Sequence, residues 1–338
     1  MFRLLKLLLC VAALAAAASA ATNLNGAGAT FPNPIYQKWF SEYHNAHPDV
    51  QINYQSVGSG AGIRQITEGT VDFGASDGPM TDQQIAELKN KRKLDVLHIP
   101  TVLGAVVPAY NVPGVTGEIK FTGQLLANIF LGKITNWNDA NIARINPGVK
   151  FPDKPIVVVH RSDGSGTTYI WTDYLSKVSP EWRDGPGKAT SVRWPVGLGG
   201  KGNEGVAGAI RQMEGAIGYV ELIYALQNKI PYGSVQNSAG EFVKASLDST
   251  TEAASVKQMP ADFRVSITNA PGKGAYPIAS FTWLLIPAEW QDQGKKQAIL
   301  DFLNWMLNSG EGMVKELSYA PLPSEVASKV KNKIKQIH

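Results

Sequence analysis

The sequence predicts an α/β protein with two lobes. Short runs rich in β-branched residues alternate with segments of helical periodicity, which is typical of sheets covered by helices. The chain of 338 residues also exceeds the roughly 250–300 residues at which a single core stops growing. Two apolar runs meet near residues 101–105, and a glycine- and proline-rich passage, Asn269–Pro277, precedes a late strand. A chain that crosses, builds a second lobe and returns would leave two connecting strands and a cleft between the lobes.

The first twenty residues have the composition of a secretory signal peptide. Arg3 and Lys6 precede an apolar run over residues 7–18, and Ala18–Ala20 is a small-residue cleavage site. The run is too short for a membrane-spanning helix. Leucines precede Cys10 where a lipoprotein signal needs small residues. We therefore expect export to the periplasm without a lipid anchor.

Cleavage after Ala20 would leave 318 of the 338 residues, without cysteine and with a formal charge of +2, since Arg3 and Lys6 are removed from a chain of +4. Disulfide and thiolate chemistry are then excluded. The charge is nearly neutral and forms no basic stripe, which argues against nucleic-acid binding. No later apolar stretch is long enough to span a membrane.

The predicted strands are distributed along the whole mature chain. They are short, rich in valine, isoleucine and aromatic residues, and bounded by turn-forming residues. In order, they are Val50–Val57, Val71–Ser76, Leu94–Val102, Gly104–Val112, Pro155–His160 and Thr282–Pro287.

Helical periodicity occupies most of the intervals between these strands. The helices are predicted to begin at Asn33, Gly62, Thr81, Thr122, Thr167, Gly205, Lys295 and Ser324. In the first helix, Pro34 suits the opening turn, and four apolar residues within Ile35–Tyr43 recur on one face. In the last, Ser324 is predicted to cap the N-terminus, and apolar residues within Val326–Ile334 form a stripe.

Four segments place small polar residues between a strand and a helix start. They are Gly26–Pro32 (GAGATFP), Val57–Ile63 (VGSGAGI), Ala75–Thr81 (ASDGPMT) and Arg161–Thr168 (RSDGSGTT). The first N–H groups of a helix lack intrahelical partners and the dipole there is positive, so an anion can accept several hydrogen bonds. Glycine allows close backbone approach, and serine or threonine adds a hydroxyl. One such turn is more often a plain helix cap, but four together indicate an anion site.

Arg161 is the strongest candidate ligand for a tetrahedral oxyanion, because its guanidinium offers a planar fork of donors. Asp163, two residues later, is placed to hold that fork. The alternative is an ordinary surface ion pair. A nucleotide is not expected, because neither these turns nor the glycines of residues 197–205 have the Gly-Lys-Ser/Thr ending of a nucleotide phosphate loop.

Asp77 is unusual in an anion site, because a carboxylate repels an anion unless the anion carries a proton that it can donate. Phosphate keeps at least one proton near neutral pH, since its second pKa is roughly 7, slightly above the ~6 of phosphoserine, whereas sulfate keeps none. A buried acceptor at Asp77 would therefore favour phosphate over sulfate. The alternative is that Asp77 caps a helix beginning near Pro79.

A secreted serine hydrolase is a competing interpretation. The segment GASDG, Gly74–Gly78, matches the Gly-x-Ser-x-Gly nucleophile elbow, with Ser76 as the nucleophile. Such an enzyme also needs a later histidine, and His98, His160 and His338 follow Ser76. No HGGG-type oxyanion segment is present, so we favour a binding protein over an enzyme.

A metal site is not expected. His44 and His47 share a predicted helix face, but the mature chain has no cysteine and no HExxH spacing. We expect no metal and no cofactor.

Seven motifs together resemble one family along nearly the whole mature chain. In order they are GAGATFPNPIYQKW, VGSGAGIRQI, TVDFGASDGPM, LGKITNWND, RSDGSGTTYIWTDYL, WPVGLGGKGNEG and GAIGYVE. They are similar to the PstS family, the periplasmic phosphate-binding components of ABC phosphate transporters. The resemblance implies a type II periplasmic binding protein, with a mixed central sheet and flanking helices in each lobe, a two-strand hinge, and one dehydrated phosphate in the cleft.

The resemblance also implies a set of ligands, a division into lobes and partners. The implied phosphate ligands are Thr30, Phe31, Ser59, Asp77, Arg161, Ser165, Gly166 and Thr167, with Asp163 as the partner of the arginine. Residues 21–102 and 278–338 would form lobe I, and residues 103–277 lobe II. We expect a monomer that delivers phosphate to an inner-membrane ABC permease. A protein for another tetrahedral oxyanion is the nearest alternative. Gly60 departs from the family, in which many members have a second serine there.

Overall fold

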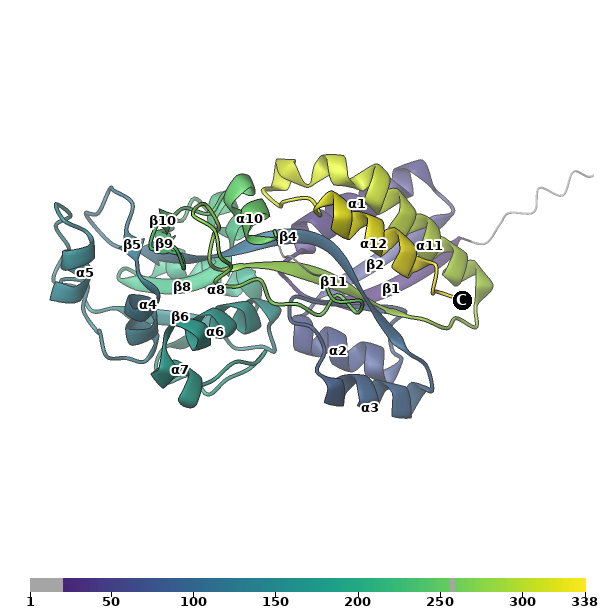
Figure 1. Cartoon of the computed structure of the whole chain (residues 1–338), viewed down its shortest axis with the longest axis horizontal. Coiled ribbons are helices and arrows are strands. Elements are labelled where there is room, and N and C mark those ends of the chain that lie inside the picture. The colour runs from purple at the N-terminus through teal and green to yellow at the C-terminus, as the bar shows by residue number, and fades with distance from the viewer. Residues whose placement is uncertain (1–20, 256–258) are drawn as a thin grey trace, which may run out of the picture.

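The computed structural model describes residues 21–255 and 259–338. The predicted signal peptide, residues 1–20, lies outside them. Figure 1 shows two lobes, each with strands flanked by helices, and two strands that run from one lobe to the other. The predicted two-lobed α/β fold class is confirmed.

Eight strands form one curled sheet that extends through both lobes, in the order β2-β1-β3-β11-β4-β8-β6-β7. Their bounds are β1 Thr22–Gly28, β2 Val50–Ser56, β3 Phe73–Ser76, β4 Val96–Asn111, β6 Val157–Arg161, β7 Leu198–Gly200, β8 Ala216–Glu221 and β11 Ala279–Pro287. β1, β2 and β3 are parallel, β4 and β11 are antiparallel, and β6 is parallel to β7 and β8. A smaller sheet has the order β10-β9-β5, with β5 Lys120–Phe121, β9 Ser234–Gln236 and β10 Phe242–Val243.

β4 belongs to both lobes. Its residues Val96–Ala105 pair with β11, and its residues Val106–Asn111 pair with β8. The sequence predicted two strands separated at Leu103, and this is wrong, since the strand is continuous over 16 residues. Gly104 does not mark a turn. It allows the Phe31 ring to approach the backbone, because a Cβ atom there would lie 2.5 Å from that ring.

β4 and β11 are also offset by a bulge. The register shifts between Thr282 and Trp283, so that Thr101 on β4 has no direct partner. The preceding residue, Pro100, cannot donate a ladder hydrogen bond, which suits an irregular position. Thr101 instead uses its hydroxyl, which donates to the Thr282 carbonyl at 3.3 Å and bonds with the Tyr36 hydroxyl at 2.9 Å.

In lobe I, helices cover both faces of β1, β2 and β3. α1, α11 and α12 lie over one face, and α2 and α3 lie over the other (Figure 1). Their bounds are α1 Asn33–Ala46, α2 Ser59–Glu68, α3 Asp82–Arg92, α11 Gln293–Asn308 and α12 Ser324–Ile334, with short 3₁₀ helices at Gly310–Met313 and Lys315–Leu317. Ser324 is not an N-cap as predicted, because Pro323 occupies that position and no side chain caps the helix.

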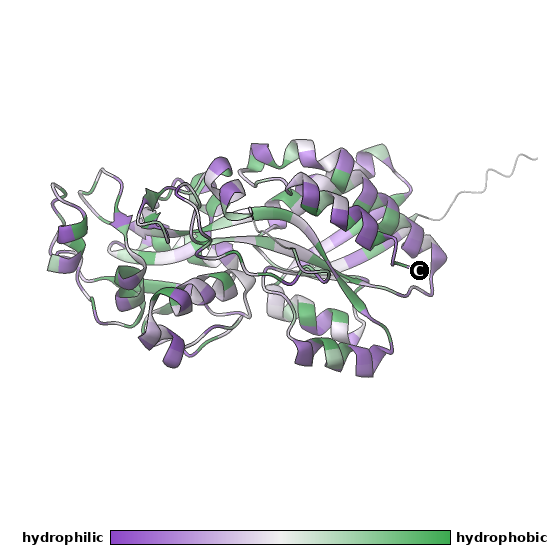
Figure 2. Cartoon of the chain, in the orientation of Figure 1, coloured by the Kyte–Doolittle hydropathy of each residue, from purple (hydrophilic) through white to green (hydrophobic). Residues whose placement is uncertain are grey.

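Lobe II is built around β8 and β6, against which α8 packs. Its helices are α4 Gly123–Phe130, α5 Ala140–Ile145, α6 Gly166–Val178, α7 Pro180–Asp184, α8 Gly202–Gln212, α9 Leu222–Gln227 and α10 Leu247–Ala253. In Figure 2 the helices alternate hydrophilic and hydrophobic residues, as expected for elements with one buried face. No helix in the described ranges is long and apolar enough to cross a bilayer.

Aromatic residues fill the core of lobe I beneath α1. Trp39 is fully buried and its indole N–H donates to the Gly310 carbonyl at 2.8 Å. Tyr36 stacks on Trp39 with ring centroids 6.0 Å apart. This cluster ties α1, whose start carries the first predicted anion turn, to the C-terminal segment.

We expect Trp39→Ala to destabilise the protein by about 3–5 kcal/mol, because it removes a fully buried indole and leaves a cavity and an unpaired carbonyl. Urea unfolding followed by circular dichroism measures this change. The control is Leu226→Ala, whose side chain is 42% exposed and should change stability by less than about 0.5 kcal/mol. A similar small change in both variants would contradict the prediction.

Candidate anion-binding site

Sheet topology brings three of the four predicted turns together in lobe I. β1, β2 and β3 are parallel, and Gly28 at the end of β1 is level with Ser56 of β2 and Ala75 of β3. Segments that follow parallel strands leave the sheet at the same edge, where open α/β sheets commonly bind ligands. Thr30, Ser59 and Asp77 lie in these segments, and all three are buried.

The fourth turn leaves the equivalent edge in lobe II. β6 ends at Arg161, which is level with Gly200 of β7. α6 begins at Gly166 and α8 at Gly202, so two helix starts follow these strands. Ser165, Gly166 and Thr167 are buried at the start of α6.

Arg161 is held by a bidentate ion pair with Asp163. Its Nε donates to Oδ1 at 2.8 Å, and its Nη2 donates to Oδ2 at 2.5 Å. Burial opposes ionisation of Asp163, but the hydrogen bonds and charge of Arg161 hold its pKa below the ordinary value. Nη1 donates to the Thr167 hydroxyl at 3.3 Å. Arg161 is only 3% exposed, so the structure places a fixed and buried positive charge at this edge.

Backbone N–H groups donate hydrogen bonds directly from one lobe to the other. The Gly166 N–H donates to the Ser59 hydroxyl at 3.0 Å, and the Gly60 N–H donates to the Gly164 carbonyl at 2.9 Å. A Cβ atom on Gly166 would lie 2.5 Å from both Asp77 Oδ2 and Ser59 Oγ. These glycines therefore allow the start of α6 to approach the start of α2 without side chains between them.

The serine hydroxyls of the site already accept hydrogen bonds from protein N–H groups. Ser59 Oγ accepts from the Asp77 and Gly166 amides at 3.2 and 3.0 Å, and Ser165 Oγ accepts from the Thr168 amide at 3.0 Å. A hydroxyl has two acceptor lone pairs and one proton. Ser165 therefore has its proton left to donate, whereas the Ser59 hydroxyl donates a long bond to Asp77 Oδ2 at 3.4 Å.

Asp77 is the carboxylate at the centre of this set and is 1% exposed. Its Oδ1 accepts a hydrogen bond from the Thr282 hydroxyl at 2.8 Å. Burial raises the pKa of Asp77 to about 7, although the Thr282 bond, the charge of Arg161 and the Ser59 bond oppose that shift. The predicted capping alternative is wrong, because α3 begins only at Asp82 and Thr81 is its cap.

Known proteins resemble this chain over most of its length. The model of the PBP superfamily domain matches residues 15–310. Phosphate-binding protein PstS of Xylella fastidiosa is 46% identical over 310 residues, covering 91% of this chain and 83% of that protein. PstS of Haemophilus influenzae is 44% identical and covers 93% of both chains. The chain belongs to the PstS family.

Solved structures share the fold of this PstS-family chain. A periplasmic phosphate-binding protein with bound phosphate, PfluDING, aligns with a TM-score of 0.74 at 20% identity, covering 92% of this chain and 93% of that one. The phosphate-binding protein of Stenotrophomonas maltophilia aligns with a TM-score of 0.70 at 17% identity, with coverages of 92% and 93%. At these identities the likeness concerns the fold alone.

The serine-hydrolase interpretation of this PstS-family chain is not supported. Ser76 is fully buried, and its hydroxyl donates to the Gly78 carbonyl and accepts from the Gly78 N–H. His98 Nε2 accepts a hydrogen bond from the Met80 N–H at 3.1 Å, and the His160 ring stacks on Trp194. His338 Nδ1 lies 2.9 Å from the Gln336 carbonyl oxygen, and within the described residues none of the three histidines is bonded to Ser76.

Two residues of the site were missed by the sequence analysis. Asn203, at the start of α8, donates to Thr30 at 2.8 Å and to Thr167 at 3.1 Å, and Thr282 donates to Asp77. Asn203 had a weak local signal, because it follows glycines at a helix start. Thr282 had no local signal, since it lies within an apolar strand.

Within residues 21–255 and 259–338, no group of histidines and carboxylates is arranged to hold a metal.

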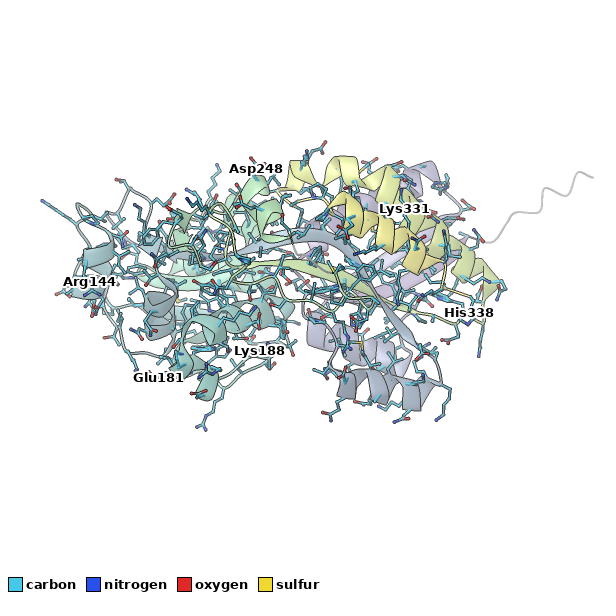
Figure 3. All side chains as sticks on the ribbon, viewed as in Figure 1. Arg144, Glu181, Lys188, Asp248, Lys331 and His338 are labelled. Atoms are coloured by element: carbon cyan, nitrogen blue, oxygen red, sulfur yellow. The ribbon has the colours of Figure 1, made fainter. Side chains whose placement is uncertain are left out.

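A buried carboxylate holds α6 in place behind the site. Asp173 accepts hydrogen bonds from Lys188 at 2.7 Å and from Ser266 and Thr268 at 2.5 Å each. Burial disfavours its charge, but the bonds from Lys188, Ser266 and Thr268 and the charge of Lys177 lower its pKa to about 2. Figure 3 labels Lys188 beside α6. This network fixes the helix that carries Gly166.

The raised pKa of Asp77 predicts a pH-dependent stability in phosphate-free buffer. The folded protein holds this proton more tightly than the unfolded chain, so the stabilising contribution is full below about pH 4 and is lost as the pH rises through 7. The free energy of unfolding of the parent minus that of Asp77→Asn should fall by on the order of 2–4 kcal/mol between pH 4 and pH 8. Urea titrations at several pH values measure it, and a constant difference would contradict the prediction.

Proposed function

We propose that this chain binds inorganic phosphate between its two lobes in the periplasm and delivers it to an inner-membrane ABC permease. The observation that supports this most is the composition of the site. Hydroxyl and amide donors from both lobes converge with the buried Arg161 around one carboxylate, Asp77. Such a set suits an oxyanion that accepts many hydrogen bonds and donates one.

The proposed ligands divide between the lobes. In lobe I, Thr30 and Ser59 would donate through their hydroxyls, and Phe31 through its N–H, for which no partner is found within the described chain. Asp77 would accept from the ligand. In lobe II the ligands would be Arg161, Ser165, Gly166 and Thr167, with Asp163 orienting the guanidinium.

The proton on phosphate explains the presence of Asp77. A bound HPO4²⁻ and Asp77 would hold a proton between one phosphate oxygen and one carboxylate oxygen. Sulfate carries no such proton, so two negative oxygens would face each other in a desolvated site, at a cost of several kcal/mol. Asp77 therefore both binds the correct ligand and excludes the wrong one.

Binding is proposed to stabilise a closed arrangement of the lobes, because the ligand has differential affinity for that state. In this proposal residues 21–102 and 278–338 form lobe I, residues 103–277 form lobe II, and β4 and β11 form the hinge between them. We further propose that the closed protein acts as a monomer, that its lobe faces beside the cleft dock on the permease, and that it is a carrier and not an enzyme.

Calorimetric titration of the mature protein with phosphate, arsenate and sulfate tests the function. The parent should bind phosphate at least about 100-fold more tightly than sulfate, because several kcal/mol separate the two ligands. In Asp77→Asn that ratio should shrink at least about tenfold, since an amide can donate to sulfate. A parent without phosphate affinity would refute the function, and tighter binding of arsenate would assign the site to another oxyanion.

Gly166→Ala should weaken phosphate binding by about tenfold to a hundredfold, because its Cβ would lie 2.5 Å from atoms of Ser59 and Asp77 and prevent full closure. Equilibrium dialysis with labelled phosphate measures this. Gly208→Ala is the matched control, since a Cβ atom there meets nothing within 4 Å. Equal affinities in the two variants would show that close contact between α6 and lobe I is not required.

A further inference from the structure

We propose that Asn203 is a positioning residue that directs the hydroxyl protons of Thr30 and Thr167 toward the bound phosphate. It acts through these two hydroxyls from the side opposite the ligand. The inference rests on the proposed phosphate binding and adds a residue that sets the direction of the hydrogen bonds in the site.

Asn203 is fully buried, and both its NH₂ group and its amide oxygen are hydrogen-bonded. Its Nδ2 donates to Thr30 Oγ1 at 2.8 Å and to Thr167 Oγ1 at 3.1 Å. Its Oδ1 accepts from the Glu221 N–H at 2.9 Å. This last bond fixes the orientation, because a flipped amide would turn a donor against the Glu221 donor. The NH₂ group must therefore face the threonines.

The remaining lone pair of each threonine hydroxyl is also used. Thr30 Oγ1 accepts a second bond from the Asn203 backbone N–H at 3.3 Å. Thr167 Oγ1 accepts a second bond from Arg161 Nη1 at 3.3 Å. A hydroxyl oxygen with both lone pairs engaged can only donate. Within the described chain neither hydroxyl donates to a protein acceptor, so two buried O–H protons remain for a ligand.

One side chain thus sets donors in both lobes. Thr30 follows β1 in lobe I, whereas Thr167 lies in α6 of lobe II. With these threonines fixed as donors, Asp77 is left as the acceptor for the phosphate proton. The protonated oxygen of phosphate must then face Asp77, and its unprotonated oxygens must face the hydroxyls. Asn203 therefore contributes to the orientation of the anion as well as to its affinity.

A mutant cycle tests this role by phosphate affinity, measured by equilibrium dialysis at pH 7. Asn203→Ala in the parent should weaken binding by about tenfold or more, because two donors lose their fixed direction. In Thr30→Val or Thr167→Val backgrounds, the loss of phosphate affinity caused by Asn203→Ala should be at least about threefold smaller than in the parent. One hydroxyl through which Asn203 acts is absent from each background. Equal costs in the parent and both backgrounds would overturn the proposal.

Asn203→Asp provides a second arm of the cycle if the alanine variant does not fold. The carboxylate keeps an acceptor for the Glu221 N–H but replaces the NH₂ donor with an acceptor, so the threonine protons should turn away from phosphate. The loss of phosphate affinity caused by Asn203→Asp should also be smaller in the two valine backgrounds than in the parent. A purely electrostatic effect would give the same loss in the parent and in both backgrounds, and this result would overturn the proposal. A parent that does not bind phosphate would refute the function itself, whereas a binding parent with additive effects refutes only the role of Asn203.

Discussion

A buried hydroxyl whose two lone pairs both accept protein hydrogen bonds has only its proton to offer, and this constraint governs Thr30 and Thr167 at the site. Ser165 accepts a helix-capping bond, Ser59 accepts amides from both lobes, and Thr30 and Thr167 accept from the same asparagine. The arginine is fixed by its own carboxylate partner. What remains is a set of donors suited to an anion, and one acid that, in the proposed function, would distinguish among anions.

The fold makes this site possible because the N-termini of helices from both lobes lie against each other. Backbone N–H groups reach across the boundary where glycines leave room, at Gly60 and Gly166. The bulge between β4 and β11 lies beside the same site, and it separates Thr282, which bonds Asp77, from Trp283. A bulge commonly reorients a side chain next to a functional site. The register shift between the two connecting strands therefore lies next to the residue that bonds Asp77.

The sequence predicted the site residues that are marked by a local motif, and it missed those that reach the site through contacts between distant parts of the chain. Glycines beside serine or threonine at a helix start are visible in a short window, so the four turns could be located. The bond from Thr282 to Asp77 spans 205 residues, and the bond from Asn203 to Thr30 spans 173, so only the folded chain brings them together. The sequence predicted two strands separated at Leu103 in place of one continuous β4, because the close approach of the Phe31 ring to Gly104 leaves no local signal.

β1 begins lobe I at Thr22, and α12 ends at Ile334 in the same lobe (Figure 1). The chain leaves for lobe II through β4 and returns through its neighbour β11. A molecule tethered by either end is therefore held through lobe I, and in the proposed closure lobe II would move against it. Immobilisation on a surface at one terminus, with a reporter dye on lobe II, would turn the motion of the lobes into an optical signal.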